Sequence, residues 1–322
     1  MDGYLSKPVR AAQLSEILGQ YLSGRRLAAC YRIENMKTWL LLLALTLSTA
    51  WAADKQILLI AGQPSHPAGE HEHNAGVRLL TKWLNTVTGI HATASYNGAW
   101  PSDADFQKAD AIFCFADGGE RHVAFEEGHP AAIAKAAARG AGLMFMHYAT
   151  EPPAQRGHEE MLDWAGGYFE INYTINPIWE ANFASFPKHP IMQGVTPFRL
   201  RDEWYYNIRF RENRKGVTGL LVTTPPAGTV GADGIRSGNP DVRTKIGQPQ
   251  IMSWAFVRPG GGRSVGFTGG HYHANLGDPN FRKILLNGLL WVAKARVPRD
   301  GVTVAVTPSE LTEGLDPKPP RR

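Results

Sequence analysis

The residues best suited to chemistry in this 322-residue chain are histidines and the carboxylates beside them. Imidazole can ligate a divalent metal or transfer protons near neutral pH, and carboxylates can assist either role. All eleven histidines lie after residue 52, and several of them are clustered. The three groups of interest are SHPAGEHEH at 65–73, His147 directly after the apolar run 143–146, and GGHYH at 269–273.

Each histidine group follows a short apolar run, which is typical of a central strand in a parallel sheet. The runs occupy 56–61, 143–146 and 263–268. In an open α/β sheet, ligands bind outside the carboxyl ends of the strands. We therefore expect the three strand ends to converge on one site.

A divalent metal such as zinc is the first ligand that converged histidines could hold. Neutral imidazole suits zinc, and three protein ligands plus one open position is the catalytic arrangement. Nearby carboxylates could add an oxygen ligand or orient a ligating imidazole. The expected metal ligands are His66, His71, His147 and His271, and the expected carboxylates are Glu70, Glu72, Asp202 and Glu203.

Simpler interpretations stay open for several of these residues. His71 and His73 can be solvated loop residues, because runs of alternating histidine and glutamate are common on surfaces. His147 can be a satisfied core histidine, since it directly follows a buried strand.

Acid–base catalysis is the second interpretation, and it is compatible with a bound metal. A carboxylate beside a histidine can hold its tautomer or raise its pKa. The expected catalytic groups are His147, His271, Asp202 and Glu203. The residues expected to bind substrate are Glu70, Glu151, Trp204, Tyr205, Tyr272 and His273, where aromatic rings could stack on the apolar faces of a sugar.

The remaining sequence supplies the elements that would position these groups. Between 56 and 146, apolar strand patterns alternate with helical ones, which predicts an α/β fold with a doubly wound, mainly parallel sheet. The aromatic-rich stretch 155–216 is expected to add antiparallel strands and loops around the cleft. The runs 250–256 and 263–268 are joined by a Pro-Gly-Gly-Gly turn and read as a hairpin. A last helix begins at Pro279.

The first 52 residues have the patterns of two separate segments. Residues 36–52 have a basic start, a short apolar run and a small-x-small end, which is typical of a secretory signal peptide. We therefore expect a secreted or periplasmic protein with no stable membrane insertion after cleavage. Residues 1–35 are similar to the last strand, loop and helix of a response-regulator receiver domain. They are either such a remnant or the product of a start codon assigned too early.

Composition excludes some functions. The chain has 34 Lys and Arg against 29 Asp and Glu, but six and three of these lie in the first 52 residues. No basic cluster with interleaved aromatics is present, so we expect no nucleic-acid partner. The chain has no P-loop or dinucleotide fingerprint, so no nucleotide cofactor is expected. Cys114 lies within an apolar strand pattern and is expected to be an inert core thiol.

The histidine groups and several other segments together resemble the ThuA-like (trehalose utilisation) family, in its secreted, glycosyl-hydrolase-like branch. The matching segments are HP at 66–67 with GEHEH at 69–73, 143–149 around His147, HPI at 189–191 with Gly194, DEWY at 202–205, and GGH at 269–271 with NGLLW at 287–291. They extend over almost all of 53–300. We assign this range to the ThuA-like domain, and 301–322 to a C-terminal tail that is expected to be mobile from Pro308.

The resemblance implies a flavodoxin-like sheet of the class I glutamine amidotransferase type and an action on carbohydrates. Where amidotransferases carry a nucleophilic cysteine at a strand–helix elbow, this chain has His147, and His271 occupies the place of the late histidine. Glutaminase chemistry is therefore not expected. The implied activity is hydrolysis or elimination on a carbohydrate or an oxidised sugar derivative, by histidine and carboxylate catalysis with a metal as a further participant. A non-catalytic sugar-binding or accessory domain is the alternative, and a structural partner in a sugar-degrading complex is a third.

Overall fold

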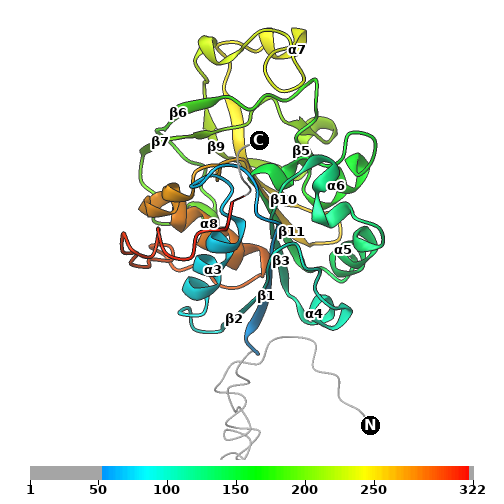
Figure 1. Cartoon of the computed structure of the whole chain (residues 1–322), viewed down its shortest axis with the longest axis vertical. Helices are drawn as coiled ribbons and strands as arrows, with labels where there is room; N and C mark the ends of the chain where they lie inside the picture. Colours follow the sequence, from blue (N-terminus) through cyan, green and yellow to red (C-terminus); the bar gives the residue numbers. More distant parts are fainter. Residues whose placement is uncertain (1–52, 319–322) are drawn as a thin grey trace, which may run out of the picture. The chain divides into compact units, whose positions relative to one another are not determined.

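A computed structural model describes residues 53–318, and it contains the predicted doubly wound sheet (Figure 1). Seven strands pair in the order β2-β1-β3-β4-β11-β10-β9, with parallel pairing from β2 to β11 and antiparallel pairing at β10 and β9. The order of the five parallel strands is that of a flavodoxin-like fold. The strands are β1 (Lys55–Ala61), β2 (Ile90–Ser95), β3 (Ala111–Phe115), β4 (Gly142–Met146), β9 (Val217–Thr223), β10 (Gln250–Val257) and β11 (Arg263–Phe267). The expected signal peptide and receiver-like segment lie outside the described residues.

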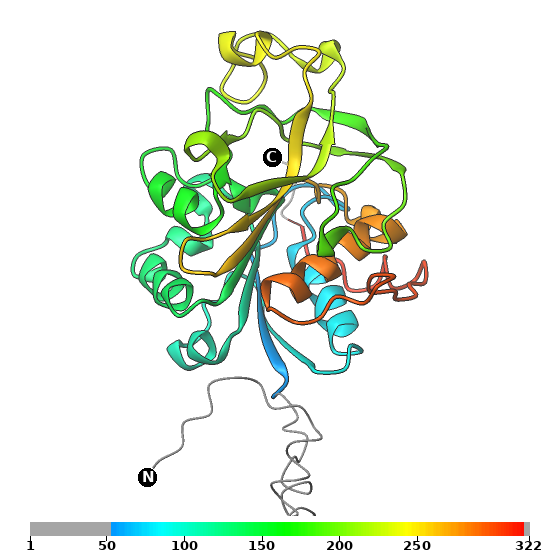
Figure 2. The same ribbon diagram turned by 180° about the vertical axis from the view of Figure 1, so that it is seen from behind.

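The central strands are apolar throughout because helices cover both faces of the sheet. On one face lie α3 (His73–Leu84) and α8 (Pro279–Val292); on the other lie α4 (Asp103–Lys108), α5 (His129–Ala138) and α6 (His158–Trp164), as Figures 1 and 2 show. Successive side chains of a strand point to opposite faces. Accordingly, Ile57 and Leu59 belong to one apolar cluster, whereas Leu58 and Ile60 belong to the other.

The stretch 155–216 adds antiparallel strands, as predicted. These are the paired strands β5 (Gly167–Tyr168) and β8 (Arg209–Phe210), and the paired strands β6 (Ile178–Phe183) and β7 (Phe198–Glu203). Alternate residues of β6 are buried and exposed, as in a strand with one covered face. The irregular segment between β9 and β10 contains the short helix α7 (Pro240–Arg243).

Single turns of 3-10 helix connect many of these elements. They are η1 (Gly119–Arg121), η2 (Val123–Phe125), η3 (His147–Thr150), η4 (Pro190–Met192), η5 (Glu212–Arg214), η6 (Ala227–Thr229) and η7 (His273–Gly277). The turn η3 begins at His147, so β4 ends directly on the histidine that the sequence placed at the strand end.

The C-terminal segment differs from the expected mobile tail. Residues 301–318 form no helix or strand, but they lie beside α3 in both ribbon views (Figures 1 and 2). The Asp316 side chain is buried against the start of α3, where it forms hydrogen bonds with Asn74 and Ala75. The segment therefore belongs to the packed domain as far as the structure describes it.

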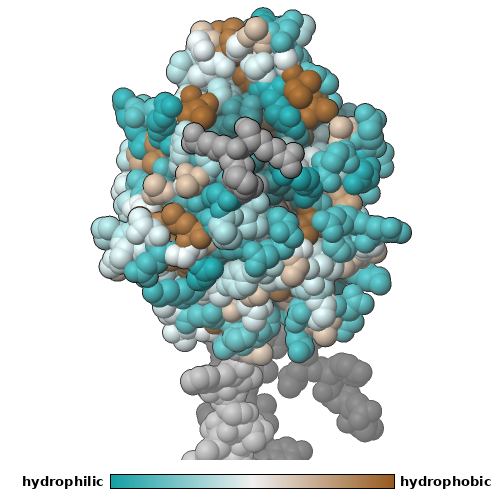
Figure 3. Space-filling view, in the orientation of Figure 1, coloured by the Kyte–Doolittle hydropathy of each residue, from teal (hydrophilic) through white to brown (hydrophobic). Residues whose placement is uncertain are grey.

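The surface in Figure 3 is mixed, with small hydrophobic patches between hydrophilic residues. Among residues 53–318, the large hydrophobic side chains that are exposed are Ile178, Val222, Ile235, Ile246 and Val257. Within residues 53–318, no helix has the length and apolar character needed to cross a membrane.

A buried histidine outside the strand-end loops, His122, gives the fold a specific pH dependence. The His122 ring is 1% exposed; its Nδ1 accepts from the Ala124 N–H, and its Nε2–H donates to the Ala149 carbonyl at 2.9 Å. Burial lowers the pKa of His122 to about 4, below the ordinary histidine value. Because the unfolded chain takes up the proton first, this contribution to stability is complete above about pH 6.5 and is lost as pH falls toward 4.

We predict that His122→Gln makes the free energy of unfolding less dependent on pH between about 4.5 and 6, by up to about 1.4 kcal/mol per pH unit. Urea unfolding of wild type and variant at several pH values measures this difference. His91→Gln, at an exposed position of β2, is the matched control and should keep the wild-type slope. Equal slopes for wild type and His122→Gln would contradict the prediction.

Candidate functional site

The candidate site lies where four neighbouring parallel strands end. β1, β3, β4 and β11 are adjacent in the sheet, so their carboxyl ends share one edge. The residues that follow them are the loop 65–72 after β1, Asp117 after β3, His147 after β4 and His271 after β11. The topology alone therefore brings side chains from distant parts of the sequence to one place.

Three imidazoles meet at this edge, as the sequence predicted. His71 Nε2 lies 3.0 Å from His147 Nε2 and 3.1 Å from His271 Nδ1. All three side chains are almost completely buried, with His271 the most accessible at 6% exposure. His71 is therefore not a solvated loop residue, and it forms the centre of the cluster.

The outer nitrogen of each imidazole faces an oxygen acceptor. His147 Nδ1 lies 2.7 Å from the Thr268 carbonyl, and His71 Nδ1 lies 3.1 Å from Asp117 Oδ1. His271 Nε2 faces Glu70 Oε2 at 3.5 Å. These acceptors favour a proton on each outer nitrogen, which leaves the inner nitrogens with lone pairs that point at one another.

One carboxyl group and one phenol complete the cluster. Glu203 Oε2 lies 3.5 Å from His147 Nε2 and 3.6 Å from His271 Nδ1. The Tyr205 hydroxyl lies 3.1 Å from His147 Nε2, and its ring stacks on that imidazole. One possible metal-ligand atom from each of His71, His147, His271 and Glu203 lies within 4.8 Å of the other three. This set of three nitrogens and one oxygen is suited to a divalent metal.

Burial makes the cluster electrically neutral near pH 7. Desolvation lowers the pKa of His71, His147 and His271, and neighbouring histidines lower it further for His71 and His147. Burial, reinforced by the nearby Asp202, raises the pKa of Glu203 to about 8. A divalent cation at the centre would favour the ionised form of Glu203 and the neutral form of each imidazole.

The site histidines have unusual backbone conformations. His66, His71 and His147 have φ values of 57°, 44° and 56°, in the left-handed region that costs a non-glycine residue about 1–3 kcal/mol. A short antiparallel bridge between Glu70 and Tyr272 joins the loops after β1 and β11 across the cluster. Such conformations persist only where the surroundings fix them, so this backbone is held in place by its contacts.

Gly270 allows the last loop to pass close to β4. Its φ is +118°, and a Cβ at this position would lie 2.4 Å from Met146 Cε and 3.5 Å from His147 Cβ. Only glycine combines this conformation with so close an approach. The glycine pair at 269–270 thus places His271 beside His147.

The structure places Asp202, which was predicted as a catalytic group, outside the four-residue cluster. Its side chain is fully buried, and its two oxygens accept from the backbone N–H groups of Gly270, His271 and Glu203 at 2.7, 3.0 and 2.8 Å. Burial raises its pKa to about 6, whereas these three donors favour the ionised form. Asp202 supports the loop that carries His271 and does not face the cluster.

The residues predicted to bind substrate divide into three groups. Trp204 is fully buried, donates to the Leu200 carbonyl and packs in the core against Phe183 and Phe267, so it is not a sugar platform. His273 is also buried, near Glu72 and Asp316, and lies away from the cluster. Tyr205 contacts the cluster, while Glu70, Glu151 and Tyr272 lie at its margin.

Two further residues at the site were not predicted from the sequence. Asp117 accepts a hydrogen bond from His71 and so orients its ring. Asp117 follows β3 just as the histidines follow their strands, so the argument from strand ends could have predicted it. Arg236 pairs with the buried Glu151 and donates to the Tyr148 hydroxyl at 3.3 Å. It lies in the irregular loop before α7, where no sequence periodicity marks it.

His66 lies outside the four-residue cluster. Its ring stacks on His71 with centroids 3.6 Å apart, and its Nδ1 lies 3.0 Å from Ser65 Oγ. It forms a second group with His71 and Asp117, but Asp117 already pairs with the Arg121 guanidinium at 2.8 Å. This neighbouring cation makes the second group a poorer metal site than the first.

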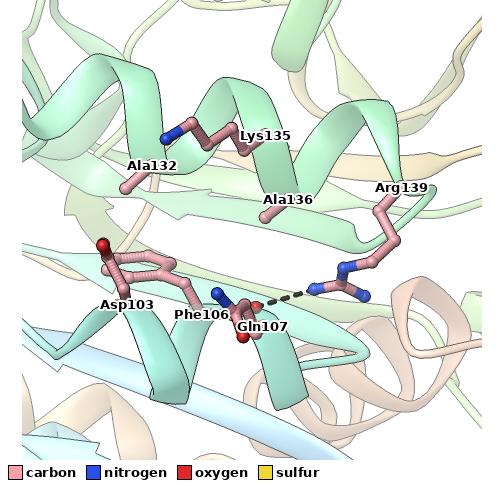
Figure 4. A pocket seen from close by; sticks show the side chains of 7 residues that line it. All are labelled: Asp103, Phe106, Gln107, Ala132, Lys135, Ala136 and Arg139. Carbon is pink, nitrogen blue, oxygen red and sulfur yellow. Dashed lines mark hydrogen bonds between the residues drawn. The ribbon is translucent and has the colours of Figure 1, made fainter.

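Two other features of the domain lie away from this chemistry. Cys114 is buried in β3, where burial raises its thiol pKa to about 12, so it is an inert core residue. A groove of about 230 Å³ lies between α4 and α5 (Figure 4). It is lined by Asp103, Phe106, Gln107, Ala132, Lys135, Ala136 and Arg139 and contains no histidine. The strand-end cluster is therefore the stronger candidate site.

Comparison with known proteins agrees with the fold. The ThuA family model, described as trehalose utilisation, matches residues 58–292. A ThuA-like protein from Bacteroides uniformis superposes with a TM-score of 0.53 at 14% identity, over 76% of this chain and 94% of that one. Another ThuA-like protein, from Parabacteroides merdae, gives 0.49 at 14% identity, over 78% and 95%. No curated protein matches the sequence significantly.

Because Asp202 and Glu203 have different surroundings, we predict that substituting them lowers the free energy of unfolding by different amounts. Asp202→Ala would leave three buried N–H groups without their acceptor, and we expect it to lower the free energy of unfolding by about 3 kcal/mol or more. Glu203→Gln keeps an oxygen that can accept the hydrogen bond from Asn176. We therefore expect its free energy of unfolding to differ from that of wild type by no more than about 1 kcal/mol. Urea unfolding of both variants tests this, and equal destabilisation would refute the structural role given to Asp202.

Proposed function

This chain belongs to the ThuA (trehalose utilisation) family, and we propose that it is an exported, metal-binding enzyme that acts on a carbohydrate or an oxidised sugar derivative. The proposed reaction is hydrolysis or elimination. Export is part of the proposal because residues 36–52 have the pattern of a signal peptide. The site proposed for the chemistry is the cluster of His71, His147, His271 and Glu203.

The metal proposal depends on one observation: inner imidazole nitrogens face one another at 3.0 and 3.1 Å, while their outer nitrogens face oxygen acceptors. Two imidazole nitrogens at that separation need either a proton or a metal cation between them. Because the outer acceptors favour protons on the outer nitrogens, a cation suits the inner nitrogens better. Ligands about 2.0–2.1 Å from one zinc ion, at angles of about 95–110°, would be about 3.0–3.4 Å apart. The observed spacing fits this requirement.

The surrounding residues have roles that suit such a centre. Asp117, the Thr268 carbonyl and Glu70 would orient the three imidazoles, and such outer partners usually tune metal affinity. When bound, a divalent cation would polarise a sugar oxygen and lower the pKa of a coordinated water. Glu203 would supply the oxygen ligand, and its pKa would fall on binding.

Proton transfer is assigned to groups at the margin of the cluster. The His66 side chain is 31% exposed, and its Nδ1 is oriented by Ser65 and lies 3.7 Å from Asp117 Oδ1. Glu70 is 28% exposed and faces His271. These partly solvated groups can exchange protons with a bound substrate, whereas the three inner imidazoles would be committed as ligands.

A carbohydrate is proposed as substrate from the family description and from the polar margin of the site. Glu70, Tyr272 and Arg236 offer carboxylate, hydroxyl and guanidinium groups near the cluster. The Arg236 side chain is 31% exposed, so it can reach a substrate oxygen while remaining paired with Glu151. These groups suit a ligand with many hydroxyls and an electron-rich oxygen.

We predict that the purified protein, stripped with a chelator and titrated with Co²⁺ or Zn²⁺, binds about one ion per chain. His71→Ala, His147→Ala and His271→Ala should each weaken binding at least about 100-fold, since each removes one of three nitrogen ligands. His91→Ala is the matched control. Circular dichroism checks that each variant is folded. Wild-type affinity in the three folded variants would exclude this cluster as the metal site.

Turnover separates the enzyme from the alternative of a sugar-binding domain. We predict that metal-loaded protein converts at least one member of a panel of disaccharides and keto-sugars, and that His66→Gln lowers kcat at least about 10-fold without loss of metal. Product analysis by mass spectrometry measures the conversion. Thermal stabilisation by a sugar with no product after long incubation would favour the binding domain instead.

A further inference from the structure

The helix that follows the His71 loop lacks a cap of its own. α3 begins at His73, and the side chain of the N-cap residue Glu72 forms no hydrogen bond with the first turn, which also contains no acidic residue. The first N–H groups of a helix have no partner within the helix and need an outside acceptor. The acceptor here comes from a residue far along the chain.

Asp316 supplies the missing cap. Its Oδ2 accepts from the Asn74 backbone N–H at 3.1 Å and from the Asn74 side chain at 2.9 Å, and its Oδ1 accepts from the Ala75 N–H at 3.0 Å. The carboxylate also places a negative charge at the positive end of the helix. Residues separated by more than 240 positions in sequence therefore fix where α3 begins.

Glu72 joins this cap to the histidine loop. The residue is 1% exposed, and its Oε1 accepts from the Gly69 N–H at 2.8 Å and lies 3.3 Å from Lys318 Nζ. Its Oε2 accepts from the Asp316 N–H at 2.6 Å. A buried carboxylate needs donors for both of its oxygens, and these contacts join Glu72, Asp316 and Lys318 in one connected network.

Lys318 binds the loop itself. Its ammonium group donates to the carbonyls of Ser65, Glu70 and His71 at 3.0, 2.7 and 3.3 Å. The side chain is only 12% exposed. One ammonium group thus holds both ends of the segment that carries His66 and His71.

We propose that Asp316 and Lys318, together called the C-terminal clamp, are positioning residues for His71. His66 and His71 have left-handed backbone conformations, which persist only when their surroundings fix them, and the clamp contacts the carbonyl of His71 itself. The clamp holds the loop so that His71 Nε2 faces His147 and His271. The inference rests on the proposed function in so far as His71 is a metal ligand.

The test compares Lys318→Met and Asp316→Ala with a matched control, Lys82→Met. Lys82 pairs with Glu310 at 2.6 Å and so joins the same two segments, α3 and the C-terminal region, but at an exposed position away from the loop. Two quantities are measured on the full-length protein at a temperature well below unfolding. They are hydrogen–deuterium exchange in peptides covering 65–76, and the Kd for Co²⁺ alone.

Both clamp variants should show at least about 10-fold faster exchange in 65–76 and a 10–100-fold higher Kd for Co²⁺, the range expected for loss of outer-shell support. Lys82→Met should match wild type in both. Unchanged exchange in 65–76 overturns the proposal. Faster exchange with an unchanged Kd also overturns it, because the clamp would then stabilise the loop without positioning a ligand.

If the wild-type protein binds no Co²⁺, the proposed metal site is refuted. The positioning role of the C-terminal clamp is then tested by a separate measurement. In that case the rate at which diethyl pyrocarbonate modifies His71, followed by peptide mass spectrometry, decides. At least about 10-fold faster modification in both clamp variants supports the positioning of His71. Equal rates in wild type and variants overturn it.

Discussion

The mutual approach of three imidazole nitrogens is the constraint on which the rest of this structure depends. His71 Nε2 lies 3.0 and 3.1 Å from nitrogens of His147 and His271, although their residues are separated by as many as 200 positions in sequence. The strands are parallel and end at the same edge of the sheet. Each strand is followed by a polar residue at that edge, so these residues lie close together. Helices cover both faces of these apolar strands, so the strands that position the imidazoles are part of the packed core.

Contacts around the cluster keep the three imidazoles in this arrangement, although several of its features are energetically unfavourable. Left-handed backbone at His71 and His147, burial of uncharged imidazoles and a carboxyl group with a raised pKa are each unfavourable in isolation. Asp202 holds the loop after β11, and contacts from residues 316–318 hold the loop after β1. Conformational strain and buried polarity of this kind occur mainly at functional sites, where the geometry matters more than local stability.

The alternation of strands and helices and the convergence of the histidines were predictable from apolar periodicity and from one rule about strand ends. The flavodoxin-like sheet was expected from the resemblance to the ThuA-like family. The structure places the Asp202 and Trp204 side chains outside the cluster, which the sequence did not predict. Adjacent residues on a strand point to opposite sides, and sequence alone did not fix which side faces the cluster. The contacts of Arg236 and Lys318 near the site were not predicted from the sequence, for another reason. They act through tertiary contacts from irregular segments, and such segments carry no periodic signal.

X-ray absorption spectroscopy of the protein loaded with one equivalent of Zn²⁺ tests the central claim most directly. Three imidazole nitrogens and one oxygen at about 2.0–2.1 Å should surround the metal, with the multiple-scattering pattern of histidine rings. His91→Ala should give the same spectrum as wild type, and His147→Ala should lose one imidazole. A shell of oxygen ligands without imidazole scattering would contradict the assignment of this histidine cluster as the metal centre.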